Sequence, residues 1–146
     1  MTSLLLAKDY LRKVQARREA LDVLFRAQSY DDVVREAQEI VELAFKGSLR
    51  CLGIEPPKRH DVAPYLAEAK GLPARWRRRL ATLKKISEVL AQERSHAFYG
   101  DETTDQPASA LFGVHDAKQA MKWADLSIEL LTDLLKGSRR PSRTAS

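Results

Sequence analysis

Apolar residues recur at intervals of three and four along most of the chain, and this spacing limits the fold more than any other feature. Between residues 4 and 28 the apolar stripe consists of Ala7, Tyr10, Leu11, Val14, Leu21, Leu24 and Phe25. Such a stripe lies on one face of an α-helix, because a helix turns once every 3.6 residues. No alternating apolar runs are joined by a hairpin dipeptide, so the sequence gives no sign of a sheet. We therefore predict an all-α protein.

Glycines and prolines divide this pattern into separate helices. Gly53 and Gly71 are suited to follow helices, and Pro73 is suited to begin one, because proline fits the first helical position. The predicted long helices cover residues 4–28, 30–52, 74–97 and 115–136, and a short helix covers residues 62–70. This order predicts an up-down bundle of four long helices plus one short helix.

The length of the chain bounds its domain organisation. With 146 residues it is long enough for one domain with a core and too short for two. We predict a single bundle domain over residues 1–137, followed by a basic tail over 138–146 that we expect to be disordered. A polar loop over residues 99–114 is long for a bundle, and such loops often carry function.

Cysteine content and hydropathy indicate the compartment. The single cysteine, Cys51, excludes an internal disulfide and suits a reducing environment. Its place late in an apolar helix favours a small buried side chain over a nucleophile. The first residues lack the basic start of a signal peptide, and no apolar run reaches the length of a membrane span. We therefore expect a cytoplasmic protein.

The net charge of +5 favours polyanionic partners such as RNA, nucleotides or acidic proteins. Much of the excess comes from residues 75–79, from Lys84 and Lys85, and from the tail. The alternative is an arginine-rich helix face that is simply solvated. The sequence leaves both interpretations open.

Several kinds of site find no support in the sequence. His60, His96 and His115 fall on different predicted elements, and no His, Cys or carboxylate set has the spacing of metal ligands. No glycine-rich phosphate loop and no nucleophilic triad can be assigned. We therefore expect neither a metal nor a cofactor.

Arg94 is the most informative charged residue in the chain. At 100° per residue it falls in the middle of the apolar face of the helix predicted over residues 74–97. A charge in that place needs a partner, because an uncompensated buried charge is costly. Glu36, at the edge of the second helix's apolar face, is one possible ion-pair partner, and a residue of a second subunit is another. The functional alternative is a guanidinium that faces a phosphate.

His60 and Asp61 come directly before the short helix. One interpretation is local: Asp61 caps that helix, and His60 bonds to nearby backbone at the bend. The other places His60 beside a nucleotide phosphate or base. Tyr99, at the end of the helix that carries Arg94, is able to stack on a base or donate a hydrogen bond.

Taken in order, several segments resemble HEPN-domain proteins, over residues 4 to 136. These segments are Tyr30-Asp31-Asp32, a helix with Glu36, Gln38 and Glu42-Leu43-Ala44-Phe45-Lys46, then His60-Asp61-Val62, Pro64-Tyr65-Leu66, and Glu93-Arg94 with Ala97-Phe98-Tyr99-Gly100-Asp101. A final helix rich in Ala and Leu completes the similarity.

The resemblance implies an all-α bundle that forms homodimers through the second and fourth helices. It also implies nucleotide or RNA binding, often beside a minimal nucleotidyltransferase partner in toxin–antitoxin or defence systems. Many members are ribonucleases with an Arg-x4–6-His motif. Arg94 matches the arginine, but Tyr99, Gly100 and Asp101 stand where the histidine is expected. This departure argues against ribonuclease activity.

Our main hypothesis is therefore a non-catalytic HEPN-like module that binds a nucleotide or RNA and acts with a nucleotidyltransferase. Arg94, Tyr99, His60 and Lys46 are the predicted binding residues. One alternative is a divergent ribonuclease that uses Arg94 with a non-standard base. The other is a structural interaction bundle in which Arg94 only forms an ion pair with Glu36.

Overall fold

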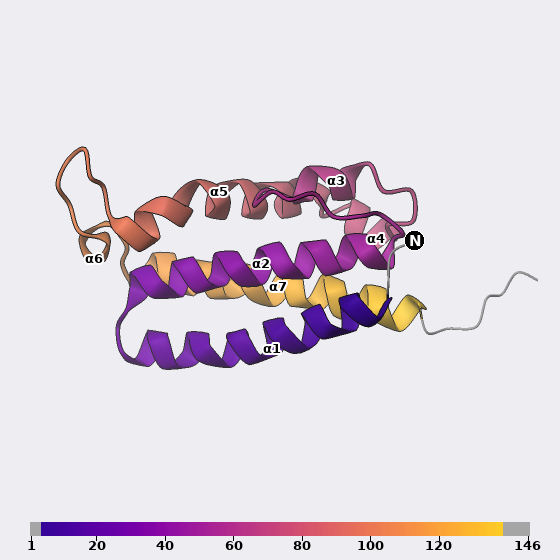
Figure 1. Ribbon diagram of the computed structural model, residues 1–146, viewed down its shortest axis with the longest axis horizontal. Helices are drawn as coiled ribbons and strands as arrows, with labels where there is room; N and C mark the ends of the chain where they lie inside the picture. The colour runs from indigo at the N-terminus through magenta and orange to yellow at the C-terminus, as the bar shows by residue number, and fades with distance from the viewer. Residues whose placement is uncertain (1–3, 139–146) are drawn as a thin grey trace, which may run out of the picture.

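Four long helices run side by side along the long axis of the molecule (Figure 1). The computed structural model describes residues 4–138. The long helices are α1 (Leu4–Arg26), α2 (Tyr30–Cys51), α5 (Leu80–Tyr99) and α7 (Val114–Ser138). Three short helices, α3 (Ala63–Ala67), α4 (Ala74–Arg77) and α6 (Ala108–Leu111), lie in the connections. The prediction of an all-α bundle with four long helices is confirmed, although three short helices replace the one expected.

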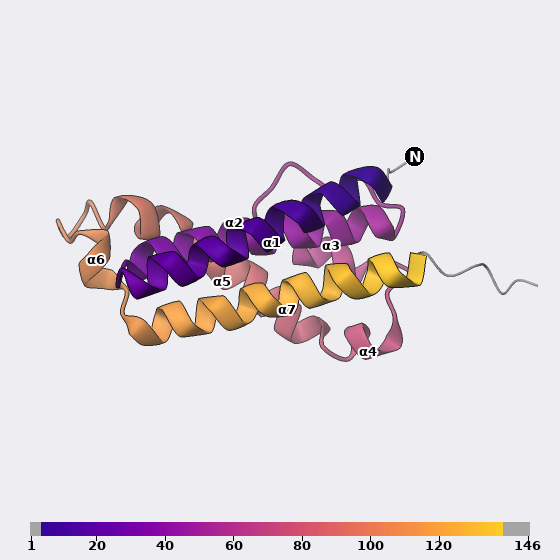
Figure 2. The ribbon, with the colours of Figure 1, turned by 90° about the horizontal axis from the view of Figure 1, so that it is seen from below.

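Helix α2 is the central element of the bundle. It packs against α1, α5 and α7, and most extensively against α7. Consecutive long helices run in opposite directions, so α2 and α7 are parallel neighbours (Figures 1 and 2). The close contact of α2 and α7 depends on Gly47, because a Cβ there would lie 3.1 Å from the methyl groups of Leu131.

The helix predicted over residues 74–97 is interrupted at Arg78 and Arg79, and this part of the prediction is wrong. Trp76 explains the break. Its side chain is buried, and its indole Nε1 donates a hydrogen bond of 3.0 Å to Asp133 of α7. A short α4 lets Trp76 reach α7, while α5 follows a separate course along α2.

The start of α3 is also capped differently from the prediction. The backbone N–H groups of Val62 and Ala63 donate to the hydroxyl of Ser87, at 3.0 and 3.3 Å. Asp61 does not cap the helix directly. Its carboxylate accepts a 2.6 Å hydrogen bond from the same Ser87 hydroxyl. Ser87 thus fixes the loop between α2 and α3 to the middle of α5.

The end of α5 requires a glycine. Gly100 has a φ of +78°, and a Cβ added there would lie 2.3 Å from the carbonyl oxygen of Gln106. Beyond it, the backbones of Asp101 and Gln106 pair through hydrogen bonds of 2.8 and 3.0 Å. The Asp101 carboxylate accepts bonds from the backbone N–H groups of Thr104 and Thr103, which lower its pKa. The loop after Tyr99 is therefore ordered by local bonds.

Two remaining predictions concern the C-terminal tail and membrane-spanning helices. The basic tail expected over 138–146 lies outside the described residues except for Ser138, which belongs to α7. Between residues 4 and 138, none of the helices combines the length and the apolar character needed to span a bilayer.

Candidate functional site

A cavity of about 420 Å³ opens between α2, the α2–α3 loop and the second half of α5. Its lining residues are Arg35, His60, Ala91, Arg94, Ser95, Phe98 and Tyr99. We call this cavity the Arg94 groove. It brings together His60, Arg94 and Tyr99, three of the four residues that the sequence predicted to bind a nucleotide. Lys46 does not line it.

Arg94 is partly buried, with 25% of its side chain exposed. Its Nη1 donates to the side-chain oxygens of Gln38 and Glu39, both on α2. Among the residues that the structure describes, its Nε and Nη2 make no hydrogen bond. The guanidinium is therefore fixed at one nitrogen and retains donors for another group.

The predicted pairing of Arg94 with Glu36 is wrong. Glu36 instead accepts a 2.8 Å bond from Arg17 of α1. The reason is the register between α2 and α5, which places Glu39, nearly one turn further along α2, against Arg94. Periodicity within one helix gives the face of a residue but not its level against a neighbouring helix.

Gln38 connects Arg94 to a second group of polar side chains. Only 2% of Gln38 is exposed. Its Oε1 accepts from Arg94, and its Nε2 donates to Glu42 over 3.1 Å. A buried amide needs both partners, because an unsatisfied polar group in the interior is costly. Gln38 was not among the predicted site residues, although a glutamine on the buried face of α2 is a signal that the sequence does contain.

Glu42 accepts three hydrogen bonds: from Gln38, from Lys46 Nζ at 3.1 Å and from His60 Nδ1 at 2.5 Å. Only 13% of its side chain is exposed. Burial by itself would raise the pKa of Glu42, but the bonds from His60, Lys46 and Gln38 outweigh it and lower the pKa below its ordinary value. The carboxylate is therefore ionised at neutral pH.

These contacts form one connected set, Arg94–Gln38–Glu42–His60, with Lys46 attached to Glu42. We call this set the polar chain. Because an ionised carboxylate only accepts hydrogen bonds, the ring Nδ1 of His60 carries the proton in this contact. In the neutral imidazole, Nε2 is then an acceptor. The local interpretation, in which His60 bonds to nearby backbone, is replaced by a contact with α2.

Two exposed aromatic residues end α5 at the mouth of the groove. Phe98 is 56% exposed and Tyr99 is 67% exposed. Their ring centroids are 4.6 Å apart in an edge-to-face arrangement. The guanidinium of Arg35 lies 5.0 Å from the centre of the Phe98 ring, and Arg35 also contacts Glu39 at 3.5 Å. The sequence analysis missed Arg35, because its role depends on a contact between two helices.

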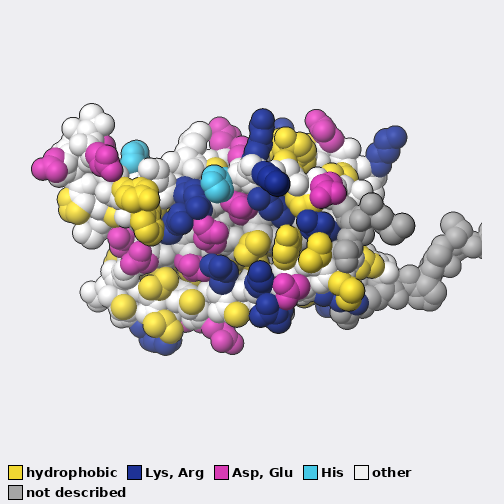
Figure 3. Space-filling model, viewed as in Figure 1, with side chains coloured by type: hydrophobic (Ala, Val, Ile, Leu, Met, Phe, Trp, Pro, Cys, Tyr) yellow, Lys and Arg dark blue, Asp and Glu magenta, His cyan; other side chains and the backbone are white. Residues whose placement is uncertain are grey.

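Arg35 and Phe98 also line a second, neighbouring hollow of about 520 Å³ between α1 and α2. Its other lining residues are Arg17, Leu24, Asp32, Glu36 and Glu39. Figure 3 shows basic, acidic and histidine side chains beside a hydrophobic group on the face that α2 and α5 present to the viewer. This face therefore offers cations, acceptors and exposed rings in a small area.

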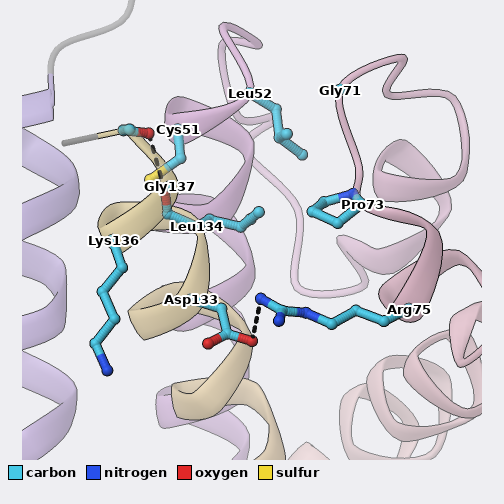
Figure 4. A pocket seen from close by; sticks show the side chains of 10 residues that line it. Cys51, Leu52, Gly71, Pro73, Arg75, Asp133, Leu134, Lys136 and Gly137 are labelled. Atoms are coloured by element: carbon cyan, nitrogen blue, oxygen red, sulfur yellow. Dashed lines mark hydrogen bonds and ion pairs between the residues drawn. The ribbon is translucent and has the colours of Figure 1, made fainter. Parts of the chain in front are cut away.

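Another cavity, of about 640 Å³, lies at the opposite end of the bundle and contains none of the predicted site residues (Figure 4). Arg75 crosses it to form a 2.7 Å ion pair with Asp133. Cys51 lines the same cavity, and burial raises the pKa of its thiol to about 11. At neutral pH this thiol is protonated and is a poor nucleophile. The Arg94 groove is accordingly the stronger candidate site.

Over residues 4–138, no group of three His, Cys, Asp or Glu side chains has a geometry that could hold a metal ion. The polar groups that line the groove are the guanidinium groups of Arg35 and Arg94, the imidazole of His60 and the hydroxyls of Ser95 and Tyr99.

Comparison with known proteins gives one result. The family model of the HEPN domain matches residues 7–134, which include nearly all of the four long helices. No curated protein and no solved structure matches the chain.

Proposed function

Because the chain belongs to the HEPN domain family, we propose that it is a non-catalytic module that binds a nucleotide or RNA in the Arg94 groove. The family supports a role related to nucleotides or RNA. The observation that carries the proposal is Arg94 itself, whose Nε and Nη2 are uncommitted in a cavity that also contains His60 and Tyr99. A planar guanidinium with two available donors suits a phosphate group.

The rest of the groove fits the other parts of a nucleotide. Tyr99 and Phe98 present aromatic faces on which a base is able to stack, and each stacked base contributes about 1–3 kcal/mol. A volume of about 420 Å³ lies within the usual range for small-molecule sites. In this proposal Lys46 acts indirectly, because it holds Glu42, which in turn holds His60.

We also propose that the module forms a homodimer through α2 and α5 and acts with a minimal nucleotidyltransferase in a toxin–antitoxin or defence system. Exposed Phe98 and Tyr99 support an interface near the end of α5, because large exposed aromatic residues are enriched where proteins meet. In such a dimer two Arg94 grooves would lie close to the interface. Sedimentation at several concentrations tests this part, and a monomer at high concentration would contradict it.

The binding proposal is tested with a pair of variants that have opposite expected effects. Arg94→Ala removes the guanidinium, and we expect binding of a fluorescein-labelled RNA ten-mer to weaken by roughly 10- to 100-fold, as charged hydrogen bonds are worth about 1.5–3 kcal/mol. Glu39→Gln keeps Arg94 but removes its ion pair. It should tighten binding, because the phosphate no longer competes with a carboxylate.

The control for this pair is Arg12→Ala on α1, which removes an exposed cation whose hydrogen bond and ion pair within residues 4–138 are both to Asp9. Its affinity for the RNA should equal that of the wild type. If Arg94 serves only to join α2 to α5, both Arg94→Ala and Glu39→Gln should lower the melting temperature and neither should change RNA affinity. No detectable binding of any RNA or nucleotide would favour an interaction bundle instead.

One observation favours a second candidate, the divergent ribonuclease. His60 comes from the α2–α3 loop, yet it lines the same cavity as Arg94, with Nδ1 in contact with Glu42, which leaves Nε2 as an acceptor when the ring is neutral. An imidazole oriented by a carboxylate is suited to general acid–base catalysis. It would accept the 2′-hydroxyl proton as the 2′-oxygen forms a bond to phosphorus. The P–O5′ bond would break, leaving a 2′,3′-cyclic phosphate, and the 5′-oxygen would take a proton from water. Such chemistry would supply the base missing from positions 99 to 101.

Cleavage assays separate the two candidates. The wild type is incubated with RNA and with the same sequence as 2′-deoxy substrate, alongside His60→Gln and the control His96→Gln. The binding module leaves all substrates intact. Cleavage of RNA alone, lost in His60→Gln but kept in His96→Gln, would replace it with the ribonuclease.

A further inference from the structure

The basic character of the chain is concentrated in one segment. Residues 70–87 contain seven cations and no acid: Lys70, Arg75, Arg77, Arg78, Arg79, Lys84 and Lys85. Removing these seven from the net charge of +5 leaves the rest of the chain at −2. A solvated surface usually carries both signs of charge interspersed. The segment is therefore unlike an ordinary charged face.

The fold fixes this segment at a corner of the bundle, at α4 and the start of α5. Figure 2 shows α4 on the side of α7 that faces away from α1 and α2. Asp133 of α7 anchors α4, because it accepts from both Trp76 and Arg75, at 3.0 and 2.7 Å. Arg77 donates to the backbone oxygens of Ala67 and Ala69 at the end of α3.

The remaining five cations have no such role: Lys70, Arg78, Arg79, Lys84 and Lys85. All five are exposed, and within residues 4–138 none of their side chains makes an ion pair or a hydrogen bond. The guanidinium of Arg79 rests 5.5 Å from the centre of the buried Trp76 ring. From Arg79 to Lys85 the rise along α5 is about 9 Å, at about 1.5 Å per residue. We call these five residues the basic corner.

The surroundings of the basic corner distinguish between classes of polyanionic partner. Of the large apolar residues of this segment, Leu72, Trp76, Leu83 and Ile86 are buried and Leu80 is partly buried, so none is exposed. The exposed large apolar side chains of the described chain lie elsewhere, at Leu4–Leu6, Val23 and Phe98–Tyr99. A protein interface needs an apolar or aromatic anchor, and a membrane-bound helix needs an apolar face. A phosphate backbone needs neither, because it is bound mainly by cations.

We propose that the basic corner binds the sugar–phosphate backbone of a nucleic acid without regard to sequence, at a surface separate from the Arg94 groove. The corner supplies charge attraction, and four of its five cations, Arg78, Arg79, Lys84 and Lys85, lie on a continuous stretch that can follow a strand. This inference does not depend on the proposed function of the groove. A longer strand could contact both surfaces, whereas a mononucleotide would use only the groove.

The experiment measures binding of labelled U20 RNA and dT20 by fluorescence anisotropy between 50 and 200 mM KCl. Four to five phosphate contacts predict a slope of log K against log salt of about −3, because each contact on a single strand contributes about −0.7. The variant with Arg78, Arg79, Lys84 and Lys85 all changed to Ala should flatten this slope by about 2.8, the share of four contacts. Its affinity at 50 mM should fall at least tenfold.

The matched control removes the same charge elsewhere, through Lys8→Ala, Lys13→Ala, Lys118→Ala and Lys122→Ala together, all exposed on α1 and α7. It should keep most of the slope. A second variant, Arg78→Lys with Arg79→Lys, retains the charge and should keep the binding. Equal losses in the corner variant and in the control would overturn the proposal, since only total charge would then matter.

Two further measurements test which class of polyanion the basic corner binds and whether it binds independently of the Arg94 groove. Polyglutamate and vesicles of phosphatidylcholine with phosphatidylglycerol should not displace U20 at equal charge concentration. Displacement by either would show a general anion surface and would contradict the proposal. Arg94→Ala should change the salt slope by no more than about 0.7, the share of one phosphate contact, whereas the corner variant should change it about four times as much. Failure of the groove proposal and failure of the corner proposal therefore give different results.

Discussion

The hydrogen bonds of the polar chain predict how much Glu42 contributes to the free energy of unfolding. Replacing it with glutamine keeps the shape but removes the charge that accepts bonds from Gln38, Lys46 and His60. Hydrogen bonds to charged groups are worth about 1.5–3 kcal/mol when one partner is removed. The His60 bond is half exposed and is partly replaced by water, whereas Lys46 keeps only 17% of its side chain exposed and loses its partner. We expect Glu42→Gln to lower the free energy of unfolding by about 2 kcal/mol at pH 7.

The same variant predicts a pH dependence. The pKa of Glu42 in the folded state lies below its ordinary value of 4.5. Its stabilising contribution is therefore fully present above the unfolded-state pKa and is lost as the pH falls through the folded pKa. The difference in stability between the wild type and Glu42→Gln should accordingly be constant from pH 6 to 8 and should shrink below about pH 4.

Urea unfolding followed by far-UV circular dichroism, at pH 7 and at pH 3, measures both effects. The matched control is Glu88→Gln on α5, where the carboxylate is exposed and accepts only a 3.5 Å bond from Gln92. Its effect should stay below about 0.5 kcal/mol, as is usual for surface positions. The polar chain does not stabilise the fold as described if Glu42→Gln lowers the free energy of unfolding at pH 7 no more than Glu88→Gln does. An equal loss of unfolding free energy for Glu42→Gln at pH 7 and pH 3 would contradict it as well.

Other consequences concern the backbone, a carboxylate and the thiol. Gly100→Ala should destabilise the fold by about 1–3 kcal/mol in thermal melts, because its backbone suits only glycine. The control is Gly113→Ala, where an added Cβ meets nothing within 4 Å. Equal melting temperatures for the two variants would contradict the expected strain at Gly100. Burial and the nearby Asp116 raise the pKa of Glu93, so Glu93→Gln should raise the melting temperature at pH 7 by removing a disfavoured charge; a decrease would refute it. Cys51, with a pKa of about 11, should react with iodoacetamide at pH 8 roughly 100-fold more slowly than a thiol of pKa 9, because its thiolate fraction is smaller. Reaction at the ordinary rate would show an exposed thiol.

The fold follows from the sequence to a large extent, because each long helix carries its own apolar stripe. The stripe of α1 placed Ala7, Val14 and Leu21 in the core, where they are fully buried. The break between α4 and α5 could not be predicted in this way. It depends on Trp76 reaching Asp133, a residue 57 positions away along the chain.

The candidate site was only partly accessible to sequence reasoning. Arg94 was recognisable as a charge on an apolar face, His60 from its place directly before the short helix, and Tyr99 from its place at the end of the helix that carries Arg94. That these three residues line one cavity depends on the α2–α3 loop, which Ser87 holds against α5. Glu36 was wrongly predicted as the ion-pair partner of Arg94, which pairs with Glu39 instead. The register of one helix along another is set by the packing of many side chains and cannot be read from the periodicity of either helix. Whether these residues bind a nucleotide stays a prediction.

A titration followed by two-dimensional ¹⁵N–¹H NMR tests the proposed function most directly. The labelled protein is titrated with each of the four ribonucleoside monophosphates. We expect saturable shifts at the residues around the Arg94 groove, including His60, Arg94 and Tyr99, for at least one nucleotide, and their loss in Arg94→Ala. Shifts confined to the cavity beside Cys51 and Lys136, or no shifts with any nucleotide, would contradict nucleotide binding in the groove.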